Sequence, residues 1–248
     1  MIQNFKMTVA YEGTRYSGWQ KQGNTANTIQ GKLEHALSAM FGCPIEVQGS
    51  GRTDAGVHAV GQVASFRADT KAVPEDICRY LRRYLPQDIG VLSVERADER
   101  FHARLSAKRK TYRYRIWNSE TPNVFERRFL YVCPEPLDAE AMRACIPYFL
   151  GEHDFRAFCS NPDLKKSSVR TVEAMTLEQL GPELRLTVTG NGFLYNMVRI
   201  LAGTLMAVGM GQRKPEEMPD ILAACDRAAA GPTAPAKGLM LVGMEYQD

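Results

Sequence analysis

The spacing of hydrophobic residues changes along the chain between a period of two, typical of strands, and a helical period of about 3.6. In the first part, the pattern predicts strands at residues 5–11, 45–47, 60–66 and 89–96. Helices are expected between Thr28, a good N-cap, and Gly42, and between Pro74 and Pro86. This strand-helix-strand-strand-helix-strand order is that of the split βαβ unit and implies an antiparallel-containing sheet with helices on one face.

The second part of the chain shows a similar mixture. Strands are expected at residues 111–117, 172–180, 184–189 and 239–246, and helices at residues 138–150, 191–211 and 216–230. Pro147 should kink or shorten the first of these helices, and residues 151–170 are expected to form a polar loop or lid. We therefore predict an α+β fold of two similarly built domains, residues 1–103 and 104–248, with mostly antiparallel sheets flanked by helices and an active-site cleft between them.

Composition narrows the classes of function. The 248 residues are 44% hydrophobic, enough for a buried core, and the net charge is only +3, so binding of nucleic acid must depend on local patches. Six cysteines without a CxxC pair and four histidines without an HExxH motif suggest reduced thiols in a cytoplasmic protein and no zinc or other metal site. Residues 1–13 lack the long apolar core of a secretory signal.

A glycine-rich loop at residues 49–59 carries one carboxylate between two predicted strands. Asp54 is the only acidic residue between Glu46 and Asp69, and it is flanked by Arg52 and His58. A lone carboxylate suits neither paired acid-base chemistry nor a hard metal ion. With a reference pKa of about 3.9, it is ionised at neutral pH and can act as a nucleophile. The alternative is an aspartate that merely closes an Asx-turn.

The strongest asymmetry of charge lies between Arg104 and Arg115, where six basic residues and no acidic residue occur. The six are Arg104, Lys108, Arg109, Lys110, Arg113 and Arg115. In the strand expected here, Tyr112 and Tyr114 share one face and Arg113 and Arg115 the other. Basic and aromatic side chains in alternation favour RNA, since charge meets phosphate while rings stack on unpaired bases. The alternative is an amphipathic strand with a solvated basic face.

Two further groups have an open interpretation. Tyr16 and Trp19 lie in a predicted loop, where they either pack beneath it or form an exposed surface for a ligand or RNA. Three arginines of the helix after Pro74 either form a solvated face or contact phosphates; these are Arg79, Arg82 and Arg83.

Residues 191–211 are apolar on nearly every side, which predicts a buried helix. Asn196 and Arg199 within this stretch argue against a membrane span. Because a buried guanidinium needs a carboxylate or several acceptors, Arg199 requires a partner, and Asp54 is the natural candidate. Pairing would orient Asp54 and keep it ionised. Alternatively, Arg199 caps backbone carbonyls in the core.

Three segments taken together closely resemble the tRNA pseudouridine synthase A family, in the order that the family has. They are GRTDAGVHA at residues 51–59, KTYRY at residues 110–114 and GFLYNMVR at residues 192–199. Residues 11–20 and 236–239 also fit the family's opening and closing motifs. The resemblance implies the pseudouridine synthase fold, an isomerase that converts uridine to pseudouridine at positions 38–40 of the tRNA anticodon stem-loop, and a homodimer with tRNA across both subunits.

The resemblance also implies roles for individual residues and no cofactor. Asp54 would be the catalytic carboxylate, whether it attacks the sugar, adds to the base or abstracts a sugar proton. Tyr112 would stack on the extruded uracil, Arg199 would pair with Asp54, and Arg52 would help to extrude the base. The remaining candidates for tRNA contact are His58, Arg109, Lys110 and Arg113.

Two other functions are weighed against this one. A non-catalytic RNA-binding protein or RNA chaperone would explain the basic strand but not an Asp54–Arg199 pair. A hydrolase with an aspartyl intermediate would need a base to activate water, and His58 is the only nearby candidate.

Overall fold

The computed structural model describes residues 2–163 and 165–246, which form two compact units. Unit 1 comprises the described residues up to Lys108 together with those from Leu241 onward, and unit 2 comprises Arg109–Met240. The expected division between residues 103 and 104 lies earlier in the chain and assigns the last strand to the second domain. As a division into functional domains, it stays a prediction.

Unit 1 is built on an antiparallel sheet in which β1 lies between β4 and β3. These strands are β1 (Ile2–Tyr11), β3 (His58–Asp69) and β4 (Ile89–Ala97). The short β2 (Val47–Gly49) pairs with β3. The part of β10 (Leu239–Tyr246) that belongs to unit 1 lies next to β3. The strand expected at residues 45–47 is therefore shifted, because only its last residue enters the ladder.

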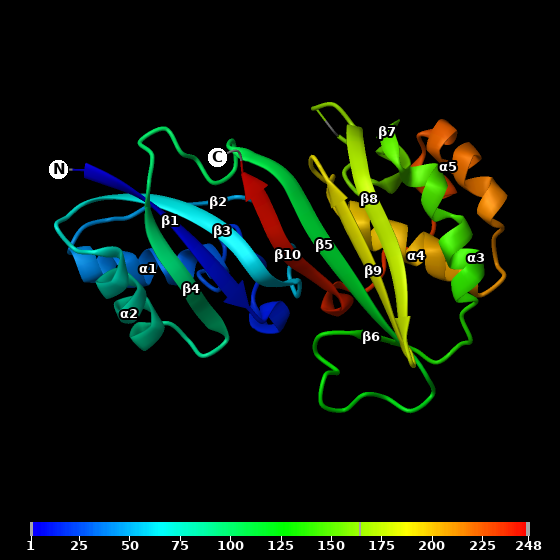
Figure 1. Cartoon of the computed structure of the whole chain (residues 1–248), viewed down its shortest axis with the longest axis horizontal. Helices are drawn as coiled ribbons and strands as arrows, with labels where there is room; N and C mark the ends of the chain where they lie inside the picture. The colour runs from blue at the N-terminus through cyan, green and yellow to red at the C-terminus, as the bar shows by residue number, and fades with distance from the viewer. Residues whose placement is uncertain (1, 164, 247–248) are drawn as a thin grey trace. The chain divides into compact units, whose positions relative to one another are not determined.

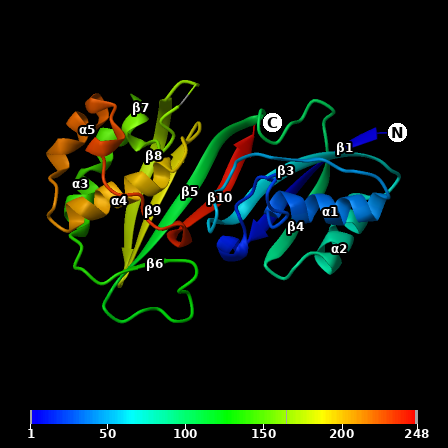
Figure 2. The same cartoon turned by 180° about the vertical axis from the view of Figure 1, so that it is seen from behind.

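Two helices, α1 (Ile29–Phe41) and α2 (Pro74–Tyr84), cover one face of this sheet (Figures 1 and 2). The hydroxyl of Thr28 accepts a hydrogen bond from the backbone N–H of Gly31 at 3.1 Å, and Gly42 closes α1 in the left-handed conformation with φ 68°. Pro74 starts α2, where its missing N–H costs nothing. The order β1-α1-β2-β3-α2-β4 confirms the prediction made from periodicity and caps.

In unit 2, four strands pair antiparallel in the order β5-β9-β8-β7. Its strands are β5 (Ala107–Asn118), β7 (Gly151–Asp154), β8 (Val169–Leu180) and β9 (Glu183–Gly190), and β6 (Tyr131–Cys133) runs parallel to β5. One face of the sheet carries buried Tyr112, Tyr114, Leu186 and Val188. This face is covered by helices (Figure 1).

The helices of unit 2 are α3 (Ala139–Ala144), α4 (Met197–Gly209) and α5 (Met218–Ala224). The helix expected at residues 138–150 ends earlier, as Pro147 suggested, and continues as a 3₁₀ turn over Ile146–Phe149. In α4, every residue except Arg199 is buried, which confirms the predicted core helix. Its start at Met197 rather than at residue 191 follows from the left-handed conformation of Asn196.

The structure also describes two segments that were expected to be loops. Residues 151–170 contain β7 and a 3₁₀ turn, Arg156–Phe158, and Phe155 and Phe158 are fully buried, so the part around this turn belongs to the core, whereas residues 161–163 and 165–167 are exposed. Trp19 and Tyr16 are buried as well, at 1% and 5% exposed, so they pack beneath their loop and offer no exposed surface. None of the described helices is both long and apolar enough to span a bilayer.

Candidate functional site

Asp54 lies in unit 1 on the loop that joins β2 to β3, and hydrogen bonds hold the backbone around it. The carbonyl of Thr53 accepts from the backbone N–H of Trp19 at 3.0 Å, and the carbonyl of Asp54 accepts from Val57 N–H at 3.1 Å. The hydroxyl of Thr53 bonds that of Tyr11, the last residue of β1, at 2.8 Å. Thr53, next to Asp54, is thus hydrogen-bonded to the end of β1 and to the loop that contains Trp19.

Buried polar groups support the stem of the Asp54 loop. Ser50 is fully buried and donates its hydroxyl to Oε1 of Gln62 at 2.7 Å. Gln62, which is also fully buried, returns an amide N–H to the carbonyl of Gly51 at 2.8 Å. Such a bonded interior network makes the loop rigid, because an unpaired buried polar group would cost free energy.

Two glycines allow the segment before α1 to lie directly against the Asp54 loop. A Cβ atom on Gly13 would lie 1.9 Å from the carbonyl oxygen of Val57. Gly18 has φ +90°, and a Cβ there would lie 2.7 Å from the carbonyl oxygen of Thr53. Side chains are therefore excluded at both positions, and the backbones can meet.

The three polar residues predicted around the loop differ in exposure. Arg52 is exposed, Asp54 is half-buried and His58 is only 2% exposed. The Nδ1 atom of His58 accepts a hydrogen bond from the backbone N–H of Gly13 at 3.0 Å. His58 thus has a structural role in this unit, and its contact with a substrate stays a prediction.

In unit 2, Tyr112 of β5 packs against Phe193, which lies in the loop before α4. The two rings are edge to face, with centroids 5.3 Å apart and an interplanar angle of 87°. Tyr112 is 8% exposed and Phe193 is half-buried. Sequence reasoning did not single out Phe193, although it belongs to the GFLYNMVR segment that contributed to the resemblance.

Arg199 projects from α4 and is half-buried rather than enclosed. Its Nε atom donates to the carbonyl of Ala234 at 2.7 Å, and Nη1 donates to Oδ1 of Asn196 at 2.8 Å. The contact with Ala234 matches the alternative prediction, in which Arg199 binds a backbone carbonyl instead of a carboxylate. Pairing with Asp54, which belongs to the other unit, stays a prediction.

A strap after α5, residues 231–235, connects Arg199 to the tyrosine face of β5. The hydroxyl of Tyr114 donates to the carbonyl of Pro235 at 2.8 Å, next to the Ala234 carbonyl that binds Arg199. Burial raises the pKa of Tyr114 far above its ordinary value, although the nearby charge of Arg199 opposes the shift. Tyr114 is therefore a neutral hydrogen-bond donor that holds the strap.

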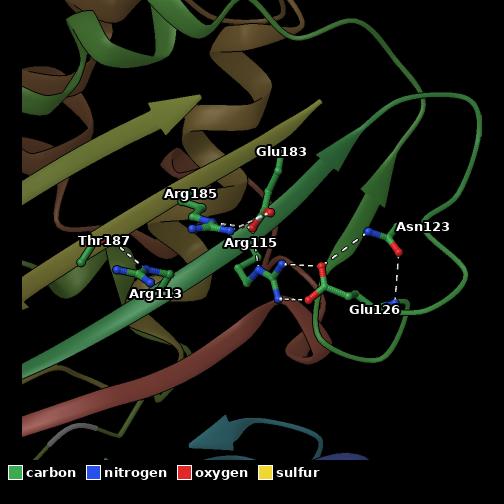
Figure 3. A network of polar contacts seen from close by, with 7 residues as sticks. All are labelled: Arg113, Arg115, Asn123, Glu126, Glu183, Arg185 and Thr187. Carbon is green, nitrogen blue, oxygen red and sulfur yellow. Dashed lines mark hydrogen bonds and ion pairs between the residues drawn. The ribbon is translucent and has the colours of Figure 1, made fainter. Parts of the chain in front are cut away.

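The opposite face of β5 carries an ion-pair network rather than free arginines (Figure 3). Arg115 bonds Glu183 at 2.6 Å and Glu126 at 2.9 Å, and Arg185 bonds the same Glu183 at 2.8 Å. Burial would raise the pKa of Glu183, but its bonds to the two arginines outweigh this and lower the pKa to about 2. Arg115 is only 9% exposed. It therefore fits neither interpretation of the basic strand, because it is not solvated and is not open to an RNA phosphate.

Two further basic residues of β5 also have partners. Arg109 forms an ion pair with Glu173, and Nε of Arg113 donates to the hydroxyl of Thr187 at 3.1 Å. Lys110 and Arg113 are half-buried and Arg109 is exposed. Within the described part of the chain, no group of three or more His, Cys, Asp and Glu side chains could hold a metal ion.

Comparison with known proteins connects these features to a family. The family model described as tRNA pseudouridine synthase matches residues 7–105 and 145–247. The chain is 47% identical over 247 residues to a tRNA pseudouridine synthase A of Brevibacillus brevis and 45% identical over 246 residues to one of Acetivibrio thermocellus. Each alignment covers 99% of this chain and 100% of the relative.

Among solved structures, a chain in the crystal structure of a Cbf5-Nop10-Gar1 complex aligns with 97% of this chain and 50% of its own length. The identity is 11% and the TM-score 0.38, which is too low to add to the assignment. The sequence matches alone are sufficient to assign the family, because they extend over both units and include the Asp54 loop, β5 and α4. This chain belongs to the tRNA pseudouridine synthase A family, a family of isomerases that modify tRNA.

Proposed function

We propose that this chain isomerises uridine to pseudouridine at positions 38–40 of the tRNA anticodon stem-loop, with Asp54 as the catalytic carboxylate. Family membership supports the substrate class and the type of reaction. One observation carries the choice of Asp54: the only carboxylate between Glu46 and Asp69 lies half-buried on a loop whose adjacent peptides are hydrogen-bonded. A fixed, partly accessible carboxylate suits a group that must meet one atom of a substrate.

The reaction balances without a co-reactant, because the product is an isomer of the substrate. The glycosidic bond between N1 and C1′ breaks, the base turns, and a bond between C5 and C1′ forms. The proton leaves C5 and a proton is bound at N1. Asp54 can attack C1′, add to the base or abstract a sugar proton, and all three roles require the ionised carboxylate that an aspartate provides at neutral pH.

Two residues of unit 2 complete the proposed site. The ring of Tyr112 stacks on the extruded uracil, and its edge contact with Phe193 supports a fixed ring plane. Arg199 pairs with Asp54 and keeps it ionised and oriented. With these assignments, the proposed catalytic cleft lies between the two units.

Contact with the rest of the anticodon arm is assigned to exposed and basic residues. Arg52 is exposed next to Asp54, and we assign it to extrusion of the target base, which costs a few kcal/mol. At the start of β5, contacts with phosphates are made by Arg109, Lys110 and Arg113. His58 contacts the substrate from the Asp54 loop. The proposal further includes a homodimer that binds tRNA across both subunits and a cytoplasmic location.

The test uses unmodified tRNA transcripts with uridine at each position of the anticodon stem-loop. Purified protein is added without metal or nucleotide, and pseudouridine is mapped through carbodiimide adducts that block primer extension. We expect new stops at positions 38–40 with the wild-type chain and none with Asp54→Asn, which should still bind tRNA.

Three outcomes would contradict the proposal. Substantial turnover by Asp54→Asn would remove Asp54 from the reaction. Tight binding of tRNA without any stops would favour a non-catalytic RNA-binding protein or chaperone. Release of free uracil that depends on His58 would favour the hydrolase.

A further inference from the structure

Asn196 has an unusual backbone conformation directly before α4. Its φ of 63° and ψ of 5° are left-handed, and Cys225 is the only other non-glycine residue with a positive φ in the described part of the chain. Asparagine tolerates this region better than most residues, although glycine occupies it at lower cost. The conformation turns the loop containing Phe193 into the helix that carries Arg199.

The side chain of Asn196 does not serve its own helix. An asparagine at an N-cap usually accepts a hydrogen bond from an N–H of the first turn, which stabilises a helix by about 1 kcal/mol. Asn196 makes no such side-chain bond in this structure. Its Oδ1 atom instead accepts from Nη1 of Arg199 at 2.8 Å, one turn along the helix.

A second contact holds the guanidinium of Arg199 through another nitrogen. Nε donates to the carbonyl of Ala234 at 2.7 Å, and the N–H of Ala234 donates to the carbonyl of Arg199 at 3.1 Å. The strap that contains Ala234 is itself fixed, because Gly231 N–H bonds the hydroxyl of Thr204 at 2.9 Å. Two acceptors from separate segments therefore define the plane of the guanidinium.

We propose that Asn196 is a positioning residue for Arg199 in the isomerisation, and that its amide, rather than its backbone, is the part required. A neutral amide orients the guanidinium and leaves its full charge for a carboxylate, whereas an acidic residue at 196 would neutralise it. The inference rests on the proposed pairing of Arg199 with Asp54. It adds a residue that acts through Arg199.

Asn196→Gly separates the two parts of the residue, because glycine accepts the left-handed backbone and lacks the acceptor. We expect its kcat to fall about 10- to 100-fold, with KM for tRNA within about threefold of wild type, as for a misplaced reacting group. Cys225→Gly is the matched control, since it relieves the same type of conformation elsewhere and should keep the wild-type kcat. Wild-type kcat in Asn196→Gly would overturn the inference.

Two further measurements distinguish this inference from the proposed role of Arg199. In an Arg199→Ala background, Asn196→Gly should cause no additional loss of kcat, whereas an additional loss of similar size would overturn the inference. Nitrogen-15 NMR of the Arg199 guanidinium should show exchange-averaged Nη signals in Asn196→Gly and restricted ones in wild type. Restricted signals in both would also overturn it. Full turnover by Arg199→Ala would overturn the role of Arg199 itself.

Discussion

The hydroxyls of Tyr11 and Thr53 lie 2.8 Å apart, and Thr53 directly precedes Asp54. Tyr11 ends the long strand β1, so this bond connects the sheet of unit 1 to the loop that carries the proposed catalytic carboxylate. Because both residues are buried, the bond is sheltered from water and holds Thr53 in one rotamer.

Removing this hydroxyl should lower both turnover and stability. We expect Tyr11→Phe to lower kcat by roughly three- to tenfold and the free energy of unfolding by about 1 kcal/mol, typical of one lost hydrogen bond. Tyr16→Phe is the control, since its hydroxyl bonds Asp88 at 2.5 Å and not the Asp54 loop. Single-turnover kinetics and urea unfolding would measure both quantities, and equal kcat values for the two variants would contradict the prediction.

A methyl group between the first loop and the Asp54 loop should separate them. In Gly13→Ala, the new Cβ would meet the backbone carbonyl of Val57, which cannot move without shifting the loop. We expect a loss of stability of about 1–3 kcal/mol, as for overpacked cores, together with a large loss of activity.

Gly23→Ala provides the comparison, because no atom lies within 4 Å of its new Cβ. Its unfolding midpoint in urea and its kcat should match the wild type. A Gly13→Ala variant as stable and active as Gly23→Ala would show that the two loops can move apart freely.

Two glycines in α4 should respond differently to alanine. A Cβ on Gly203 would lie 1.9 Å from the carbonyl oxygen of Pro232, in the strap that leads to Ala234. A Cβ on Gly209 would instead meet the flexible end of Met142, at 2.9 Å from its sulfur. We expect Gly203→Ala to lose about 1–3 kcal/mol and Gly209→Ala to change by less than about 1 kcal/mol, since alanine also favours the helix.

The measurement is again urea unfolding, combined with turnover on tRNA. The activity of Gly203→Ala should fall further than the loss of folded protein explains, because displacement of the strap removes the acceptor for Nε of Arg199. Activity in proportion to the folded fraction would argue that the strap has no part in orienting Arg199.

Glu183 should make the fold sensitive to acid. Its pKa of about 2 lies below the ordinary value near 4.3 that it has when unfolded, so its ionised form stabilises the folded chain above about pH 4. This contribution, on the order of 1–3 kcal/mol, is lost as the pH falls from about 4 towards 2. Glu183→Gln should be less stable than wild type at pH 7 and should lose less stability between pH 7 and pH 3.

Urea unfolding at the two pH values would test this, with Glu152→Gln as an exposed control on β7. Parallel losses of stability in wild type and Glu183→Gln would show that the network around Arg115 does not control acid unfolding.

The local signals of the sequence located most helices and strands and fixed the ends of some of them. Thr28 and Gly42 bound α1 because a side-chain oxygen and a left-handed glycine act within one turn of the helix. Period-two alternation located β5, β8 and β9, since neighbouring side chains in a strand point to opposite faces. The lone Asp54 in a glycine-rich loop was also visible in the sequence alone.

Only the tertiary structure decided which side chains are buried and which partners they have. Alternation placed Arg115 on a basic face, but Glu183 of β9 and Glu126 of the loop after β5 contact it there, and the three form an ion-pair network. Likewise, the burial of Trp19 and the contact between Arg199 and the carbonyl of Ala234 depend on the paths of other segments. Periodicity defines the faces of an element, whereas contacts between residues far apart in the chain decide what covers each face.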